Sequence, residues 1–407
     1  MIFTLIKNEL IKLLRRGKTW VVFGLFLALI TGSIFLSYYG SKDSEYRNSP
    51  QGQIESLNRQ IDLANNRIKD AEKSSESWAK EEVINSKQQI EKDQELIKIQ
   101  EDLLKNENDP NSWKKNLENE KENIEKTLND KSGNEESKQY QNERLEAINY
   151  YLDNDVKPIE SWKFNAINYL KDIIQVLGLI ILVSGIAVFM SDMVSGESTP
   201  PTLKFLLVQP ISRGKVILSK FIAVVITVVS MIGGLELLAF GVVGVVGGFD
   251  GTKIPEIIHK TYEFDYSNLN RMGEPMIKQV TNSGFTATRG DALLQSFGLQ
   301  VLFIITCCAF VFLISALFKS SMTTMALTVI ISVASTMACM VSAKVAKVAH
   351  LMFFNYGRSG DVISGDISGV FQNPNFNISL GIGLMIGTII FSYVIAHIVF
   401  SKKDILI

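Results

Sequence analysis

The chain has 407 residues, of which 46% are hydrophobic and 20% charged, and its formal net charge is -1. These averages conceal a segregation, because residues 41–165 hold 20 Lys and Arg against 28 Asp and Glu, while the rest holds 21 against 14. An acidic polar module inserted into a basic-flanked apolar frame indicates a membrane protein rather than two or three soluble domains. The three cysteines, Cys307, Cys308 and Cys339, fall in apolar stretches, which excludes a disulfide-stapled polar module.

Six apolar, nearly uncharged runs are long enough to cross a bilayer, which takes about 20 residues. A buried helix of a soluble protein rarely stays apolar on all faces over such a length, so we expect an all-α fold with six transmembrane helices. In chain order the expected spans are Trp20–Tyr39, Ile173–Met190, Phe221–Phe249, Ala292–Phe318, Ser320–Ala343 and Ile378–Phe400.

Lysine and arginine gather on one side of these spans. They precede the first span at 7–18, separate the second from the third at 204–220, and follow the sixth at 402–403. The positive-inside rule then predicts cytoplasmic termini and a cytoplasmic 191–220 loop. We expect a multi-pass protein of a bacterial plasma membrane whose opposite side receives residues 41–165, about 250–291 and about 344–377.

In the first sixteen residues the apolar side chains recur at nearly helical spacing, at positions 2, 5, 6, 10, 13 and 14, and the basic side chains fall on the other face. This pattern predicts an amphipathic helix lying in the cytoplasmic interface. The alternative is a simple extension of the first span. We expect three parts in the chain. Residues 1–40 hold this N-terminal segment and the first span, residues 41–165 form the inserted module, and residues 166–407 hold spans two to six.

Apolar residues within 41–165 are sparse but recur in heptads, as in a coiled coil. The breaks between these seams fall at 74–75, 106–110 and 131–134. We therefore expect antiparallel helical hairpins outside the cytoplasm, between the first two spans; a partly disordered charged tether is the alternative. The seams comprise Ile54, Leu57, Ile61, Ala64, Ile68 and Ala71; Val83, Ile90, Ile97 and Leu104; Trp113, Leu117, Ile124 and Leu128; and Leu145, Ile148 and Leu152.

The stretch from Ser195 to Phe221 reads as a short amphipathic helix at 198–209 between two spans. Thr199 can cap it, Pro200 suits its first position, and Pro210 ends it. The order Glu-Ser-x-Pro-Pro-Thr-Leu-x-Phe-Leu-Leu, then Gln-Pro-Ile-Ser-Arg, resembles the permease subunits of ABC transporters of the type-2 exporter class. The resemblance implies that this is the coupling helix docking on the ATPase, formed by Glu197, Thr202, Leu203, Leu206, Leu207, Pro210, Ser212 and Arg213. The alternative is an interfacial helix that merely anchors the loop.

Motifs for enzymatic chemistry are missing from the sequence. Gly17-Lys18-Thr19 lacks the upstream glycine of a phosphate loop, the three histidines have no zinc spacing, and no hydrolase arrangement stands out. We therefore expect no enzyme, no metal and no cofactor, with ATP bound by the partner subunit. Glu236 is the one acid well inside a span, where a charge costs about 3 kcal/mol. It faces the bundle, a cavity or a partner; functional and purely structural roles, including a protonated one, both remain open.

The resemblance extends to the six-span frame and to the C-terminal Phe400-Ser401-Lys402-Lys403-Asp404, but not to the inserted module. It implies a dimer of permeases, homo- or heteromeric, bound to two ABC ATPase subunits in membrane lipid, exporting a lipid, peptide, polysaccharide or drug. No nucleic acid partner is expected. The alternatives are a membrane-anchored coiled-coil receptor or scaffold without transport, which explains the insertion better, and an ion-coupled transporter, which needs more intramembrane charge than one glutamate.

Overall fold

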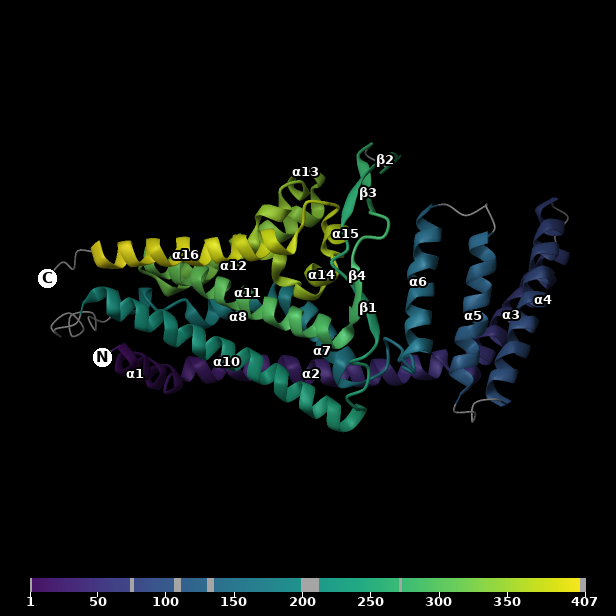
Figure 1. The fold of residues 1–407 in the computed structure, drawn as a ribbon, viewed down its shortest axis with the longest axis horizontal. Helices are drawn as coiled ribbons and strands as arrows, with labels where there is room; N and C mark the ends of the chain where they lie inside the picture. Colours follow the sequence, from purple (N-terminus) through teal and green to yellow (C-terminus); the bar gives the residue numbers. More distant parts are fainter. Residues whose placement is uncertain are drawn as a thin grey trace. The chain divides into compact units, whose positions relative to one another are not determined.

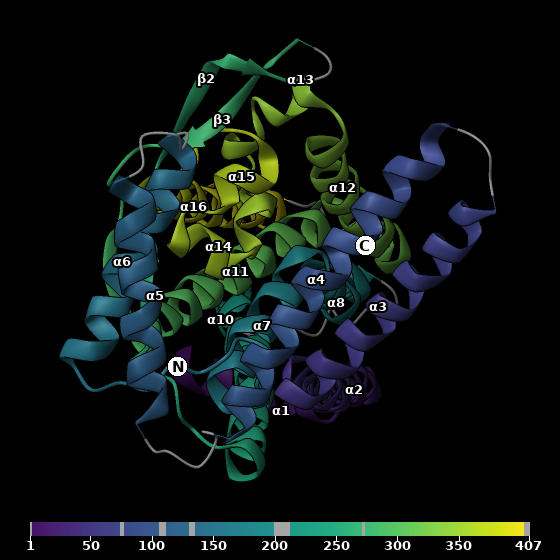
Figure 2. The ribbon, with the colours of Figure 1, turned by 90° about the vertical axis from the view of Figure 1, so that its right-hand side faces the viewer.

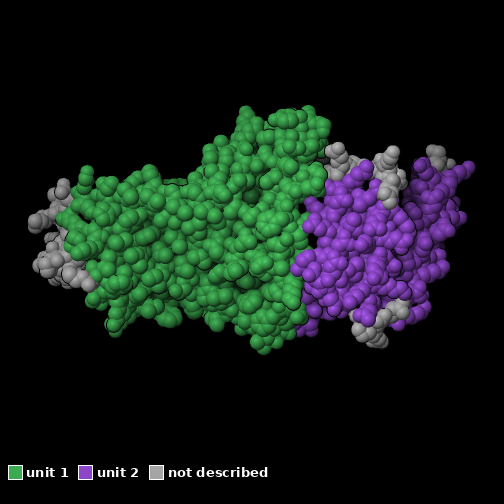
Figure 3. Space-filling view, viewed as in Figure 1, with its two compact units in different colours: residues 1–34, 165–407 green, residues 35–164 purple. Residues whose placement is uncertain are grey.

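The computed structural model describes residues 2–73, 77–105, 111–129, 135–198, 212–270 and 273–402. The chain divides into two compact units, one of residues 1–34 and 165–407, and one of residues 35–164 (Figure 3). We call the first the membrane unit and the second the insert. Of the described residues 79% are helical, so the expected predominantly α membrane protein is confirmed in this coarse form.

The long helices of the membrane unit follow the apolar runs of the sequence (Figure 1). Five of them are long and apolar enough to span a membrane, and a bent pair, α7 with α8, is a sixth candidate. Helix α11 is central, because it packs against α7, α8, α10, α12, α14 and α16, and Phe303, Cys307 and Phe312 on it are fully buried. The helices are α1 (Ile2–Leu14), α2 (Gly17–Asn48, whose residues 35–48 belong to the insert), α7 (Ala166–Leu179), α8 (Ile181–Met190), α10 (Arg213–Gly247), α11 (Arg289–Leu317), α12 (Ser321–Val341) and α16 (Ile378–Lys402), with the 3₁₀ turn η1 (Ser195–Ser198) before α10.

The second expected span is not one straight helix. It bends by 62° between Ala166–Gly178 and Ile181–Met190. Gly178 lies against Gly357, and a Cβ on either glycine would collide with the other's backbone oxygen. Only glycine allows backbones to approach so closely, so this contact fixes the 353–357 segment against α7.

Residues 250–291 carry four short strands that the sequence analysis did not predict. β1 (Pro255–Ile258) pairs antiparallel with β4 (Phe285–Thr288), from Pro255↔Thr288 to Ile258↔Phe285. β2 (Tyr262–Leu269) pairs antiparallel with β3 (Pro275–Gln279), and Figure 2 shows these two strands side by side. Aromatic and branched residues in these short runs favour strands once a partner is at hand.

Residues 343–371 fold into short helical turns that support the strands. His259 and Lys260 donate backbone hydrogen bonds to Ile363 and Ser364 at 2.8 and 3.0 Å. Gly365 takes a φ of 92° where a Cβ would meet the Lys260 backbone, so glycine is required there. The turns are α13 (Ala343–Ala346), η2 (Ala349–Leu351), η3 (Phe353–Gly357), α14 (Ser359–Ser364) and α15 (Ile367–Phe371).

Asp366 joins this support to β2 through its carboxylate. Its Oδ1 lies 2.6 Å from Lys260 Nζ and accepts from the Tyr262 hydroxyl at 3.0 Å, while Oδ2 accepts from Ser364 at 2.8 Å. Burial by itself would raise the pKa of Asp366, but the Lys260 ammonium and the two hydroxyls outweigh it and lower the pKa below its ordinary value. The carboxylate is therefore a stabilising part of this support.

The insert consists of helices packed in two pairs, α3 with α4 and α5 with α6. Their bounds are α3 (Pro50–Glu72), α4 (Ser77–Lys105), α5 (Ser112–Asn129) and α6 (Glu135–Asp153), so each gap between helices falls at a break expected from the seams. Ala64, Ala71, Leu117 and Ile148 are buried in these contacts. Arg144 of α6 binds Glu120 of α5 with two hydrogen bonds of 2.7 and 2.9 Å.

Candidate functional site

The expected coupling residues lie within and beside the connection 199–211, between η1 and α10. Glu197 belongs to η1, while Ser212 and Arg213 are the N-cap and first residue of α10. In Figure 1 the start of α10, helix α1 and the end of α16 lie at one end of the membrane unit, which we name the terminal end. The other expected residues and most of the predicted 198–209 helix lie outside the described residues: Thr202, Leu203, Leu206, Leu207 and Pro210.

The chain before the connection is held by the junction of α1 and α2. Asp192 forms an ion pair with Arg16, and its Oδ1 lies 3.1 Å from Lys18 Nζ. The same ammonium donates to Ser191 Oγ at 2.9 Å. These side chains are between one fifth and one third exposed, so solvent screens the pairs only in part.

A buried hydroxyl of α11 holds the same turn from its other side. Ser315 Oγ accepts from the backbone N–H groups of Val194 and Ser195, each at 3.1 Å, and donates to the Ser191 carbonyl at 3.0 Å. Ser315 is completely buried, so no water can replace it without rearrangement. The turn leading into η1 is thereby fixed to the central helix.

The chain after the connection is held by α1 and α16. Lys220 is 1% exposed, and its ammonium lies 3.1 and 3.2 Å from the two carboxylate oxygens of Glu9 on α1. Arg213 donates to the Ser401 carbonyl at 3.0 Å, and Gly214 packs on the His397 ring. Helix α1 and the junction that follows it therefore hold both flanks of the connection.

Glu236, the intramembrane carboxyl whose role the sequence left open, lies on α10 and is completely buried. Its Oε1 accepts a hydrogen bond of 2.7 Å from Nε2 of Gln300 on α11, which is also completely buried. Glu236 Oε2 and Gln300 Oε1 have no hydrogen-bond partner. The side chain thus faces the bundle, and its partner is an amide.

The family model described as ABC-2 family transporter protein matches residues 3–405. The chain belongs to the ABC-2 transporter family. The resemblance in the sequence is confirmed, and this ABC-2 protein is the permease subunit of an ABC transporter, the membrane component that works with a separate ABC ATPase. No curated protein and no solved structure matches the chain.

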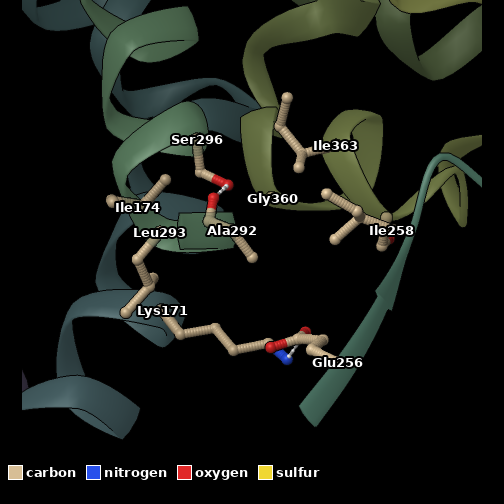
Figure 4. A pocket seen from close by; sticks show the side chains of 10 residues that line it. Lys171, Ile174, Glu256, Ile258, Ala292, Leu293, Ser296, Gly360 and Ile363 are labelled. Carbon is tan, nitrogen blue, oxygen red and sulfur yellow. Dashed lines mark hydrogen bonds and ion pairs between the residues drawn. The ribbon is translucent and has the colours of Figure 1, made fainter. Parts of the chain in front are cut away.

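Far from the terminal end, a small cavity of the ABC-2 permease is lined by Lys171, Glu256 and mainly apolar side chains (Figure 4). Lys171 pairs with Glu256, and Arg289 lies 3.4 Å from the same carboxylate while donating to Asn168 at 2.9 Å. The cavity measures about 20 Å³, room for a single water molecule. It is too small for a transported substrate, and its ion pairs join α7, β1 and α11.

Within the described part of the permease, no group of three or more His, Cys, Asp or Glu could hold a metal ion. Sequence reasoning missed the residues that fix the flanks of the connection, since only the packing brings them together: Glu9, Asp192 and Ser315. Gln300 carried a usable signal, because it lies well inside the mostly apolar run 292–318, where Gln295 near the start is the other amide. A polar side chain inside a span points to a partner within the bundle.

Proposed function

We propose that this permease is part of an ATP-driven exporter in which the 199–211 connection binds the ATPase. The observation that carries the proposal is that α1 and the junction after it hold both flanks of the connection, through Arg16 and Lys18 on one side and Glu9 on the other. A loop that only anchored the chain would not need both of its flanks fixed to the same N-terminal segment, α1 and its junction with α2. The predicted stripe of Leu203, Leu206 and Leu207 supplies the surface that the ATPase buries.

The anchors give the connection a mechanical role. Removing one partner of a buried ion pair costs about 3–5 kcal/mol, so the Glu9–Lys220 pair keeps α1 and α10 together during a movement. Ser315 similarly ties the turn before η1 to α11. A displacement of the connection by the ATPase would therefore reach α10, α11 and α1 together, and these helices would open and close the pathway.

In this proposal the protein lies in a bacterial plasma membrane, and its terminal end and both chain termini face the cytoplasm. The basic residues of the terminal end support this orientation. Helix α1 exposes Phe3, Ile11 and Leu14, at 83%, 40% and 54%, beside its lysines. Such a helix lies in an interface, with apolar side chains among acyl chains and cations at anionic headgroups. In this position it stands where an ATPase would dock.

A second permease copy, identical or not, would complete the pathway in this proposal. Helix α10 exposes a set of large apolar side chains in its second half that need lipid or another span to cover them. A lipid, a peptide or a drug-like molecule is the expected substrate class, because it would meet these apolar surfaces. The set is Leu237, Leu238, Val242, Val245 and Val246.

The insert would lie outside the cytoplasm and contact the substrate or an accessory protein. A groove of about 400 Å³ runs along α3 and α4 and is lined mainly by polar side chains, among them Arg67, Glu82 and Gln89. Polar groups of both charges in one groove suit a peptide or a polar headgroup better than an apolar chain. The groove supports a binding role for this module.

The test replaces Leu206 by Asp and isolates the protein from its native membrane. Burying a leucine stabilises a contact by about 1.5–3 kcal/mol, so Leu206→Asp should release the ATPase that co-purifies with the wild type, or leave it bound but uncoupled. The matched control is Lys204→Asp, which places the same charge off the predicted stripe and should retain the ATPase. A Leu206→Asp protein that keeps its ATPase and transports at the normal rate would show that the segment is only an anchor, and equal loss in both variants would refute the stripe.

A further inference from the structure

The pair formed by Glu236 and Gln300 contains an inconsistency if the carboxyl is ionised. One hydrogen bond of 2.7 Å joins Gln300 Nε2 to Glu236 Oε1, and the second oxygen of each side chain is buried without a donor. A carboxylate only accepts hydrogen bonds, so ionised Glu236 cannot satisfy Gln300 Oε1. Each unsatisfied buried acceptor costs about 1–3 kcal/mol.

An ionised Glu236 would also need a cation, and the elements packed against it supply none nearby. On α10 the nearest cation is Lys220, which is 16 residues or about 24 Å away along the helix and is bound to Glu9. On α11, Arg289 lies 11 residues from Gln300, about 16 Å, and is bound to Glu256, as is Lys171 of α7.

The remaining titratable groups on these helices do not change this result. Asp291 lies nine residues from Gln300 on α11, about 13 Å, and would repel a carboxylate rather than stabilise it. On α7, the Tyr169 hydroxyl, which interacts electrostatically with Glu236, is hydrogen-bonded with Ser33 at 2.8 Å, and Asp172 is a further acid rather than a cation. On α1 and α16, which pack against the first turns of α10, Glu9 and His397 lie beside Lys220 and Gly214, far along the helix from Glu236.

We propose that Glu236 is a proton-binding site of the permease, held as a neutral carboxylic acid that pairs with the Gln300 amide through two hydrogen bonds and locks α10 to α11. One proton on Oε2 supplies the donor that Gln300 Oε1 needs, so both unpaired oxygens are satisfied at once. The proton is the occupant that suits two side chains of 0% exposure, because it needs no additional volume. The Glu236–Gln300 pair does not involve the ATPase. Its test is therefore independent of the proposal that the 199–211 connection binds the ATPase.

Infrared spectroscopy of the purified full chain in lipid at neutral pH tests the proton directly. The carbonyl stretch of a protonated carboxylic acid is separate from the carboxylate and amide bands. We expect such a band in the wild type and its loss in Glu236→Gln, whereas Glu9→Gln, which removes an ion-paired carboxylate, should leave it in place. A wild-type spectrum whose only difference from Glu236→Gln is a carboxylate band would overturn the proposal, as would evidence for a bound water or cation in place of the proton.

The partner is tested with variants that keep or remove the second hydrogen bond. Glu236→Gln can form an amide pair with Gln300 and should melt close to the wild-type temperature, whereas Glu236→Met strands the amide and should melt lower. Gln300→Leu keeps the acid but removes its partner, so the acid band should persist and shift to higher frequency. An unshifted band in Gln300→Leu would refute the pairing, and this measurement decides the question even if Glu236→Met fails to fold.

Discussion

The ion pair between Glu9 and Lys220 allows a quantitative test of how α1 is held. Replacing Glu9 by Met leaves the Lys220 ammonium, on a residue that is 1% exposed, without its carboxylate. Loss of one partner of a buried pair costs about 3–5 kcal/mol. We expect this cost to appear as local detachment of α1 from α10 rather than as global unfolding, because α1 packs mainly against this one helix.

Amide hydrogen exchange measured by mass spectrometry on the protein in lipid discs reports this detachment. Since each 1.36 kcal/mol is a factor of ten in an equilibrium, peptides of α1 should exchange about 100-fold faster or more in Glu9→Met. Lys7→Met is the control, because it removes an exposed charge from the same helix and should leave exchange unchanged.

The double variant Glu9→Met with Lys220→Met separates a loss of contact from a stranded charge. Replacing both partners by apolar side chains of similar volume is often neutral or stabilising, so the double variant should recover most of the wild-type protection. The reasoning is refuted if Glu9→Met exchanges like the wild type, or if the double variant opens as readily as the single one.

Three further outcomes follow from the described contacts. Ser315→Ala strands two buried backbone N–H groups and should lower the free energy of unfolding by about 1–3 kcal/mol, whereas Thr306→Val, which removes a hydroxyl bonded only within its own helix, should have little effect in the same thermal melts. Because the folded pKa of Asp366 is lowered, its contribution is fully present above the unfolded carboxyl pKa of about 3.9 and is lost as pH falls through the folded value. The protection factors of the β2 amides, which correct for the slower intrinsic exchange in acid, should therefore fall, and unchanged protection factors would argue against this support. A cysteine at the exposed Asn65 should react with an impermeant thiol reagent in intact cells and one at the exposed Ser212 should not, since the native cysteines are buried; the reverse labelling would invert the proposed topology.

The sequence by itself determined the features that depend on local pattern. Uninterrupted apolar length predicts the long helices of the membrane unit, and the seam around Ala64 and Ala71 predicts which faces of the insert are buried. Pro210 and the ordered motif around it were enough to indicate the family, which the match over residues 3–405 confirms. The helix expected at 198–209 and its role in coupling stay predictions, because most of it lies outside the described residues.

Only the tertiary structure decided which distant residues meet. Glu9 pairs with Lys220, Ser315 accepts hydrogen bonds from the turn at 194–195, and Glu236 accepts one from Gln300. These contacts form because helices remote in sequence pack side by side. The bend after Gly178 and the strand pairs between 255 and 288 likewise depend on partners elsewhere in the chain. Apolar periodicity states which face a helix buries but not against which neighbour, and a polar side chain inside a span acquires its chemistry from that neighbour.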